Sequence, residues 1–141
     1  MKQNPEVAKR IEALAAKGGR YRREAWFFVA RSLSFANREV RGQARHQHLN
    51  AADLLEGFRQ LARQEYGPLA LDVLNFWGLR STRDVGEIVF AMVRAGILAS
   101  RREDVLADFD DAYDFHREFL EPPAPAGPAT ATDSKATRYI A

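Results

Sequence analysis

Apolar residues recur along much of the chain at the three- and four-residue spacing of amphipathic helices. The spacing is most regular after Thr82, where Thr82 itself, or Ser81 with Asp84, supplies an N-terminal cap. Gly96 ends the pattern, as glycine often does just beyond a helix. The apolar positions are Val85, Ile88, Val89, Met92 and Val93. We therefore predict a helix between Thr82 and Gly96.

Two helices are predicted near the start of the chain. The first has Asn4 as its cap and Pro5 at its first position, and it ends at the glycine pair 18–19. The second runs from residue 21 to about residue 35. Its continuous apolar run, residues 25–30, fits a buried helix or a strand equally well by periodicity, and the length of the segment favours a helix.

The middle of the chain predicts two more helices. Asn50, with Asp53 three residues later, forms a variant capping box at the start of one helix, which ends at Gly67. Pro68 begins the next helix and Gly78 stops it. Glycine past the end of one helix and proline just inside another is the expected asymmetry.

A last helix is predicted from Ser100, which forms a capping box with Glu103, to about Leu120. The proline pair that follows cannot continue it. We therefore predict an all-α fold, a compact bundle of about six helices over residues 1–121. Residues 122–141 are rich in proline and alanine and are predicted to form a disordered tail.

Composition narrows the class of protein. Hydrophobic residues make up 46% of the chain, which is enough for a real core and excludes wholesale disorder. The sequence has no cysteine, so disulfides, thiolate nucleophiles and cysteine-ligated metals are excluded. No stretch resembles a signal peptide or is long and apolar enough to span a bilayer. We therefore expect a cytoplasmic protein without a membrane partner.

Charge is distributed unevenly between the two halves. Residues 1–64 hold 13 Lys or Arg against 6 Asp or Glu, whereas residues 65–141 hold 8 against 13. Such an asymmetry can steer charged partners, or the two halves can pack with their opposite charges facing each other. The sequence leaves both interpretations open.

Arginines surround a polar stretch, residues 37–49, that lacks clear periodicity and is long for a loop. Guanidinium groups suit phosphate, so contact with RNA, DNA or a ribonucleoprotein is a fair hypothesis, although interspersed glutamates keep the field modest. The arginines are Arg20, Arg22, Arg23, Arg31, Arg38, Arg41 and Arg45. The tail adds Arg138, Tyr139 and Ile140, which either dock into a partner groove or are idle.

A rival hypothesis is a small metal-dependent enzyme. His46 and His48 could join Asp111, within the acidic segment Asp108–Asp114, as metal ligands. The spacing of that segment does not match a calcium-binding EF-hand, and a solvated face of the last predicted helix explains it more simply. No nucleophile elbow or phosphate-binding glycine loop occurs. No cofactor is therefore expected.

A third hypothesis is a winged-helix-like DNA-binding regulator. Two helices between Pro68 and Arg94 with the turn 78–81 between them have the spacing of a helix-turn-helix. The second of these helices is mostly apolar, which leaves Arg83, Glu87 and Arg94 to contact bases. Core packing is the better explanation for that helix.

Many motif residues lie in a fixed order between Tyr21 and Phe119. They are Tyr21, Ala25, Trp26, Phe28, Val29, Leu54–Gly57, Tyr66, Gly67, Val73, Leu74, Trp77, Gly78, Thr82, Asp84, Gly86–Phe90, Asp104, Asp108, Phe109 and Tyr113–Phe115. With these motifs the chain resembles an uncharacterised family of small bacterial proteins that is catalogued only by a locus-tag label. The chain departs from that family at residues 48–51, where a β-branched residue with Ser or Thr and Gly is more usual. The resemblance implies no reaction and no functional residue.

Taken together, these patterns favour a non-catalytic helical interaction protein. The expected partner is a protein or a ribonucleoprotein, with RNA as one possibility, and the Arg-rich loop and the tail are the expected contacts. The oligomeric state does not follow from the sequence.

Overall fold

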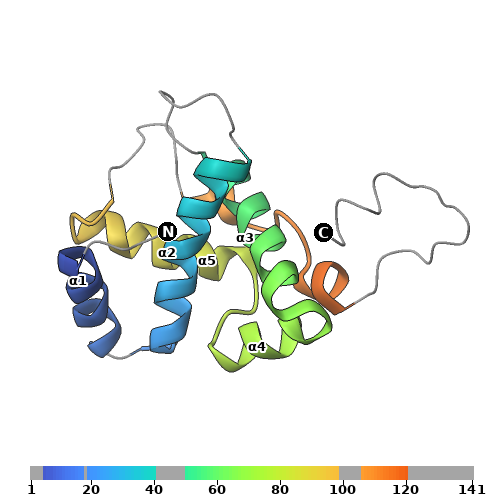
Figure 1. Cartoon of the computed structure of the whole chain (residues 1–141), viewed down its shortest axis with the longest axis horizontal. Coiled ribbons are helices and arrows are strands. Elements are labelled where there is room, and N and C mark those ends of the chain that lie inside the picture. Colours follow the sequence, from blue (N-terminus) through green and yellow to red (C-terminus); the bar gives the residue numbers. More distant parts are fainter. Residues whose placement is uncertain (1–4, 18, 41–49, 99–105, 121–141) are drawn as a thin grey trace, which may run out of the picture.

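The computed structural model describes residues 5–17, 19–40, 50–98 and 106–120 of the 141-residue chain (Figure 1). Every regular element in these ranges is helical, which confirms the predicted all-α fold. The α-helices are α1 (Pro5–Ala16), α2 (Arg23–Glu39), α3 (Ala51–Tyr66), α4 (Ala70–Phe76) and α5 (Thr82–Arg94). Three short helical segments accompany them, namely η1 (Gly67–Leu69), η2 (Leu106–Phe109) and the π-helical η3 (His116–Leu120). None of the described helices is both long enough and apolar enough to cross a membrane.

The helices α2 and α3 form the centre of the molecule, where they lie side by side and run in opposite directions (Figure 1). They approach closely because Gly57 has no side chain. A Cβ atom at Gly57 would lie 2.5 Å from the Cβ of Ala36. This close approach brings Phe28 of α2 against Phe58 of α3, with ring centroids 5.4 Å apart.

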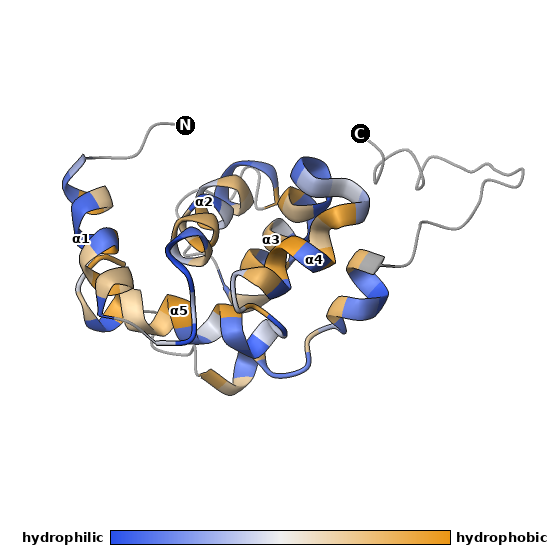
Figure 2. Cartoon of the chain, turned by 90° about the horizontal axis from the view of Figure 1, so that it is seen from below, coloured by the Kyte–Doolittle hydropathy of each residue, from blue (hydrophilic) through white to orange (hydrophobic). Residues whose placement is uncertain are grey.

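Aromatic side chains from several elements build the core around this pair. Trp77, which follows α4, packs on Phe28 and Tyr66. Phe58 also contacts Phe119 of η3 and Phe115, which directly precedes η3. Polar residues occupy the other sides of the helices, so that hydrophobic and hydrophilic positions alternate along each ribbon (Figure 2). Burial of the aromatic rings is the main source of stability for a fold of this kind.

Several local predictions are confirmed at the helix ends. The Asn50 side chain accepts a hydrogen bond from the Asp53 backbone N–H, 2.8 Å away, at the start of α3. Gly67, Gly78 and Gly96 all have positive φ angles and follow helix ends, as predicted. Asn4 lies outside the described residues, and so do Ser100 and Glu103. Pro68 lies within η1, so α4 begins two residues later than predicted.

Two predicted boundaries are wrong. The helix α2 continues to Glu39, four residues beyond the expected end at Phe35. The reason is tertiary, because Phe35 and Ala36 are buried against α3 and hold the last turn in place. Polar residues 37–39 simply occupy its exposed side.

The second error concerns residues 106–120, which form η2, a turn and η3 instead of the end of one long helix. Phe109, Phe115 and Phe119 are all buried. On a straight helix, Phe109 and Phe115 would point about 120° apart, so one apolar face could not bury both. The chain breaks instead at Asp111, which has a φ angle of 48°. The four aspartates of this segment are exposed, as expected, and Glu118 is half-buried, but these residues do not share one helical face.

Candidate functional site

A stripe of basic, polar and aromatic residues follows one side of α2. Its members are Arg23, Phe27, Arg31, Ser34 and Arg38, at intervals of four, four, three and four residues. These intervals keep all five side chains on one face of a helix. The three arginine side chains are between 44% and 57% exposed. We call this set the α2 stripe.

Each arginine of the α2 stripe lies over an aromatic ring. The distance from the guanidinium carbon to the ring centroid is 4.9 Å for Arg23 over Phe27 and 5.4 Å for Arg31 over Phe28. It is 5.7 Å for Arg38 over Phe35. A guanidinium that stacks on a ring loses less side-chain freedom on binding, because its plane is already oriented.

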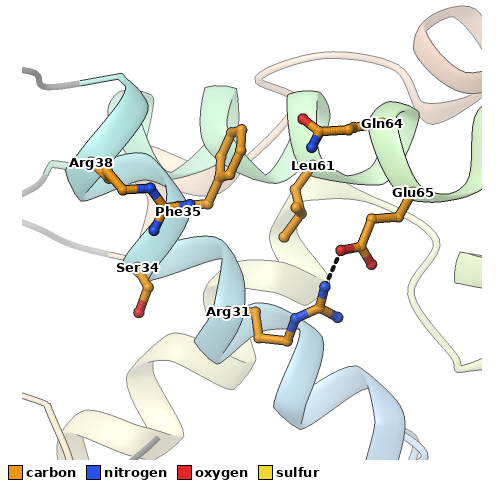
Figure 3. Close-up of a pocket in the computed structure, with 7 residues that line it drawn as sticks. All are labelled: Arg31, Ser34, Phe35, Arg38, Leu61, Gln64 and Glu65. Atoms are coloured by element: carbon orange, nitrogen blue, oxygen red, sulfur yellow. Dashed lines mark hydrogen bonds and ion pairs between the residues drawn. The ribbon is translucent and has the colours of Figure 1, made fainter. Parts of the chain in front are cut away.

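The α2 stripe borders a groove of about 460 Å³ between α2 and α3 (Figure 3). The groove is lined by Arg31, Ser34, Phe35, Arg38, Leu61, Gln64 and Glu65. Phe35 and Leu61 are buried and supply apolar contacts, while the side chains around them are polar. The combination of an apolar base with hydrogen-bond donors at its rim is typical of a ligand-binding groove.

Carboxylates accompany the arginines of the α2 stripe. Glu12 accepts from Arg23 at 2.5 Å, Glu65 pairs with Arg31, and Glu39 lies 3.1 Å from Arg38. The hydrogen bond from Arg23 holds the pKa of Glu12 below its ordinary value. Ion pairs at the surface contribute little to stability, so another anion can replace these carboxylates at small cost.

Arg20 has a structural role instead. It donates to the Asp84 carboxylate at 2.6 Å, and Tyr21 donates to the same carboxylate at 2.7 Å. The Asp84 carboxylate also accepts from the backbone N–H groups of Arg80 and Ser81 at the start of α5. Burial, strengthened by the bond to Asp84, raises the pKa of the Tyr21 hydroxyl, which therefore stays protonated. This cluster joins the start of α2 to α5.

The remaining predicted contact residues fall into two groups. Arg22 directly precedes α2, and its guanidinium carbon lies 4.2 Å from the centroid of the Phe76 ring. Seven candidates lie outside the described residues, namely Arg41, Arg45, His46, His48, Arg138, Tyr139 and Ile140. The structure therefore aligns Arg23, Arg31 and Arg38 on one face of α2, whereas Arg20 contacts Asp84 and Arg22 contacts Phe76.

The metal-site hypothesis requires several His, Asp or Glu side chains close together. Within the ranges given above, no three His, Asp or Glu side chains lie close enough together to hold a metal ion. Asp111 is exposed, and its two proposed histidine partners fall outside those ranges.

The winged-helix hypothesis requires side chains of α5 to enter a DNA groove. Val85, Ile88 and Met92 of α5 are buried, and its residue Gly86 packs against the ring of Phe109. Arg83 is paired with Glu87 and Asp110. Few side chains of α5 are therefore free to enter a DNA groove.

The uneven charge of the two halves is partly resolved inside the molecule. Arg20 pairs with Asp84, Arg31 with Glu65, and the buried Arg59 lies 3.8 Å from Glu118. Each pair joins the basic first half of the chain to the acidic second half. Opposite charges thus do face each other across the fold, as one of the two open interpretations holds.

Several motif residues that carry the family resemblance have a structural role. A Cβ at Gly78 would lie 2.4 Å from the backbone oxygen of Arg20, and Gly57 and Gly86 leave similar space for their neighbours. The Tyr113 hydroxyl donates to the backbone oxygen of Leu55 at 2.7 Å. These motifs therefore specify the packing of the fold.

Sequence reasoning identified Arg23 and Arg38 as contacts but missed their alignment with Phe27 and Ser34. The helical spacing of the α2 stripe is readable in the sequence. It was hidden because the predicted helix ended at residue 35, which placed Arg38 in a loop. Gln64 and Glu65 carried no signal, since they reach the groove only through the pairing of α2 with α3.

Comparisons of the chain with protein-family models, with curated proteins and with solved structures gave no match. The family resemblance stays a prediction.

Proposed function

We propose that this chain is a non-catalytic RNA-contacting protein that binds the phosphates of a single strand along the α2 stripe. The observation that carries the proposal is the alignment of Arg23, Arg31 and Arg38 on one face of α2, each stacked on an aromatic ring. Phe28 and Phe35 are buried and can only orient the guanidinium groups, while the half-buried Phe27 is the one ring of the three that a base could reach. The stripe therefore suits phosphate contacts with at most one stacked base.

The spacing along α2 suits a single strand. At a rise of about 1.5 Å per residue, Arg23 and Arg31 are about 12 Å apart along the helix axis, and Arg31 and Arg38 about 10 Å. A stacked strand advances about 3.4 Å per nucleotide, so neighbouring arginines of the stripe are about three nucleotides apart. The groove beside Arg31 and Arg38 lies between two such contacts.

Further positive charge follows the stripe in the sequence. Arg41 and Arg45 come three and seven residues after Arg38, so they are tethered close to the end of the stripe. The carboxylates paired with the stripe do not prevent binding. RNA phosphates that replace them release condensed counterions, and this release favours the exchange at low salt.

The test measures binding of the full chain to a fluorescein-labelled single-stranded RNA oligomer by anisotropy, over a range of salt concentrations. The stripe variant is Arg31→Gln with Arg38→Gln, and the control is Arg80→Gln with Arg94→Gln. The control removes the same charge from exposed residues outside the stripe. We expect the slope of log affinity against log salt to become less steep by about 1.4 in the stripe variant. Each of the two lost phosphate contacts contributes about 0.7 to this change.

Equal loss in the two variants would show that only net charge matters and would refute the stripe. Circular dichroism and melting temperature of both variants check that the fold is retained. A chain that binds no RNA at low salt refutes the proposal outright, and a protein partner at the same surface then becomes the better hypothesis.

A further inference from the structure

Two large apolar side chains of the described residues stand out because they are largely exposed. Leu69 is 61% exposed and Phe76 is 66% exposed. They lie seven residues apart on the solvent side of η1 and α4, with the half-buried Val73 between them at helical spacing. The opposite side of α4 carries Ala70, Leu71 and Leu74, which are buried.

Charged groups border this apolar surface. Asp72 is exposed, and helical geometry places it beside Phe76 on the outer side of α4. The guanidinium of Arg22 covers part of the Phe76 ring from the start of α2. We call Arg22, Leu69, Asp72, Val73 and Phe76 the α4 patch. An apolar centre with a charged rim is the usual anatomy of a binding surface for a short peptide.

We propose that the α4 patch is covered by residues 138–140 of the same chain. Tyr139 and Ile140 are the only large apolar residues after Leu120, and Arg138 precedes them directly. Their side chains match the centre of the patch, while the Arg138 guanidinium complements the Asp72 carboxylate. In Figure 1, α4 lies away from the C-terminal end of α2, although Arg22 of the patch directly precedes Arg23 of the stripe.

The connection between the two segments is long enough and begins in the right place. The last described element, η3, packs against both η1 and α4 (Figure 1). A flexible chain of the length of residues 121–138 has a root-mean-square span of about 23 Å and a maximum reach of about 60 Å. Such a tether gives a millimolar effective concentration, so even a weak contact is populated.

The absence of cysteine from the sequence allows a clean test in the full chain. Thr137→Cys carries a nitroxide spin label, and paramagnetic broadening is read from ¹⁵N–¹H spectra. We expect selective loss of the amide signals of residues 69–76 and of Arg22. The broadening should vanish in two double variants. One replaces Tyr139 and Ile140 of the segment with Ser, and the other replaces Leu69 and Phe76 of the patch with Ser. A label at Lys9→Cys on α1 is the control.

Each alternative outcome is distinguishable. Uniform or absent broadening of residues 69–76 refutes the contact. A second experiment mixes chain that carries the nitroxide but no ¹⁵N with chain that carries ¹⁵N but no nitroxide. Broadening in this mixture means that a second copy supplies the segment, which overturns the intramolecular proposal. Because Leu69 and Phe76 are exposed, their variant should keep its melting temperature and its RNA affinity, and this separates the two proposals.

Discussion

Gly57 sets the distance between α2 and α3, because any side chain there would meet Ala36 at 2.5 Å. Helix backbones in a packed core cannot move apart without opening cavities elsewhere. We expect Gly57→Ala to lower the free energy of unfolding by about 1–3 kcal/mol, measured by urea denaturation.

The reciprocal change offers the control for this prediction. Ala36→Gly in the Gly57→Ala background returns the lost space. The double variant still has one glycine within this helix pair, so its stability should return to near that of the original chain. A Gly57→Ala variant as stable as the original chain would show that α2 and α3 lie further apart than described here.

Asp84 makes stability depend on pH. Burial alone would raise the pKa of its carboxyl, but bonds from the Arg80 backbone, Tyr21 and Arg20 outweigh burial and hold the pKa below the ordinary 3.8. The unfolded chain therefore binds this proton more readily than the folded one. The stabilisation by Asp84 is complete above pH 3.8 and is lost as pH falls toward the lower folded pKa.

Asp84→Asn removes this titration, so the variant should be less stable at neutral pH but should lose less stability on acidification. The measurement is the free energy of unfolding in urea at several pH values from neutral to about 3. Other carboxyl groups titrate in both proteins, and the difference between the two curves isolates Asp84. Parallel curves would contradict its assigned role.

At the scale of elements, Thr82 joins α5 to the segment after η2. Its hydroxyl is buried, donates to the Phe109 backbone oxygen at 2.5 Å and accepts from the Ala112 backbone N–H at 3.1 Å. Thr82→Val keeps the shape but leaves both backbone groups without this partner. We expect a loss of about 1–3 kcal/mol in the free energy of unfolding.

Thr82→Ser is the matched control, since it keeps the hydroxyl and removes only a methyl group. If the hydrogen bonds carry the effect, the serine variant should be more stable than the valine variant. The reverse order would mean that packing of the methyl group, and not the hydroxyl, holds residues 106–112 against α5.

The sequence predicts best those elements that are specified locally. The start of α3 at Asn50 and the three glycine stops depend on neighbouring residues, and all are confirmed. The end of α2 and the path of residues 106–120 depend on contacts with distant elements, such as Ala36 with Gly57. Periodicity within α2 cannot supply that contact. In residues 106–120 the spacing of Phe109 and Phe115 does argue against one straight helix, but it does not give the path that the chain takes instead.

The same division holds for the candidate site. The arginines of α2 are visible in the sequence as a basic cluster. How each of them is held depends on residues far along the chain, since Arg20 pairs with the buried Asp84, 64 residues away, and Arg22 contacts Phe76. Only the three-dimensional structure could reduce the cluster to Arg23, Arg31 and Arg38.

For the whole molecule, the consequence is that salt should affect stability and binding differently. Of the ion pairs that join the two halves, Arg31–Glu65 lies at the surface, and such a pair contributes about 0–1 kcal/mol. Arg20–Asp84 and Arg59–Glu118 each have one buried member, which salt screens less. The aromatic core around Phe28 and Phe58 depends on apolar burial, which simple chloride salts change little. RNA binding by the stripe, in contrast, depends on counterion release.

Raising NaCl tenfold, from about 50 to about 500 mM, should therefore leave the melting temperature almost unchanged while RNA affinity falls about a hundredfold. This factor follows from three phosphate contacts at about 0.7 each, a slope near −2 on logarithmic axes. Both quantities can be read from the same samples, by thermal denaturation and by anisotropy. Surface phosphate contacts require that the protein releases RNA while its fold stays stable. If the melting temperature fell together with the RNA affinity, the RNA would be lost because the fold weakens, and this would contradict the proposal.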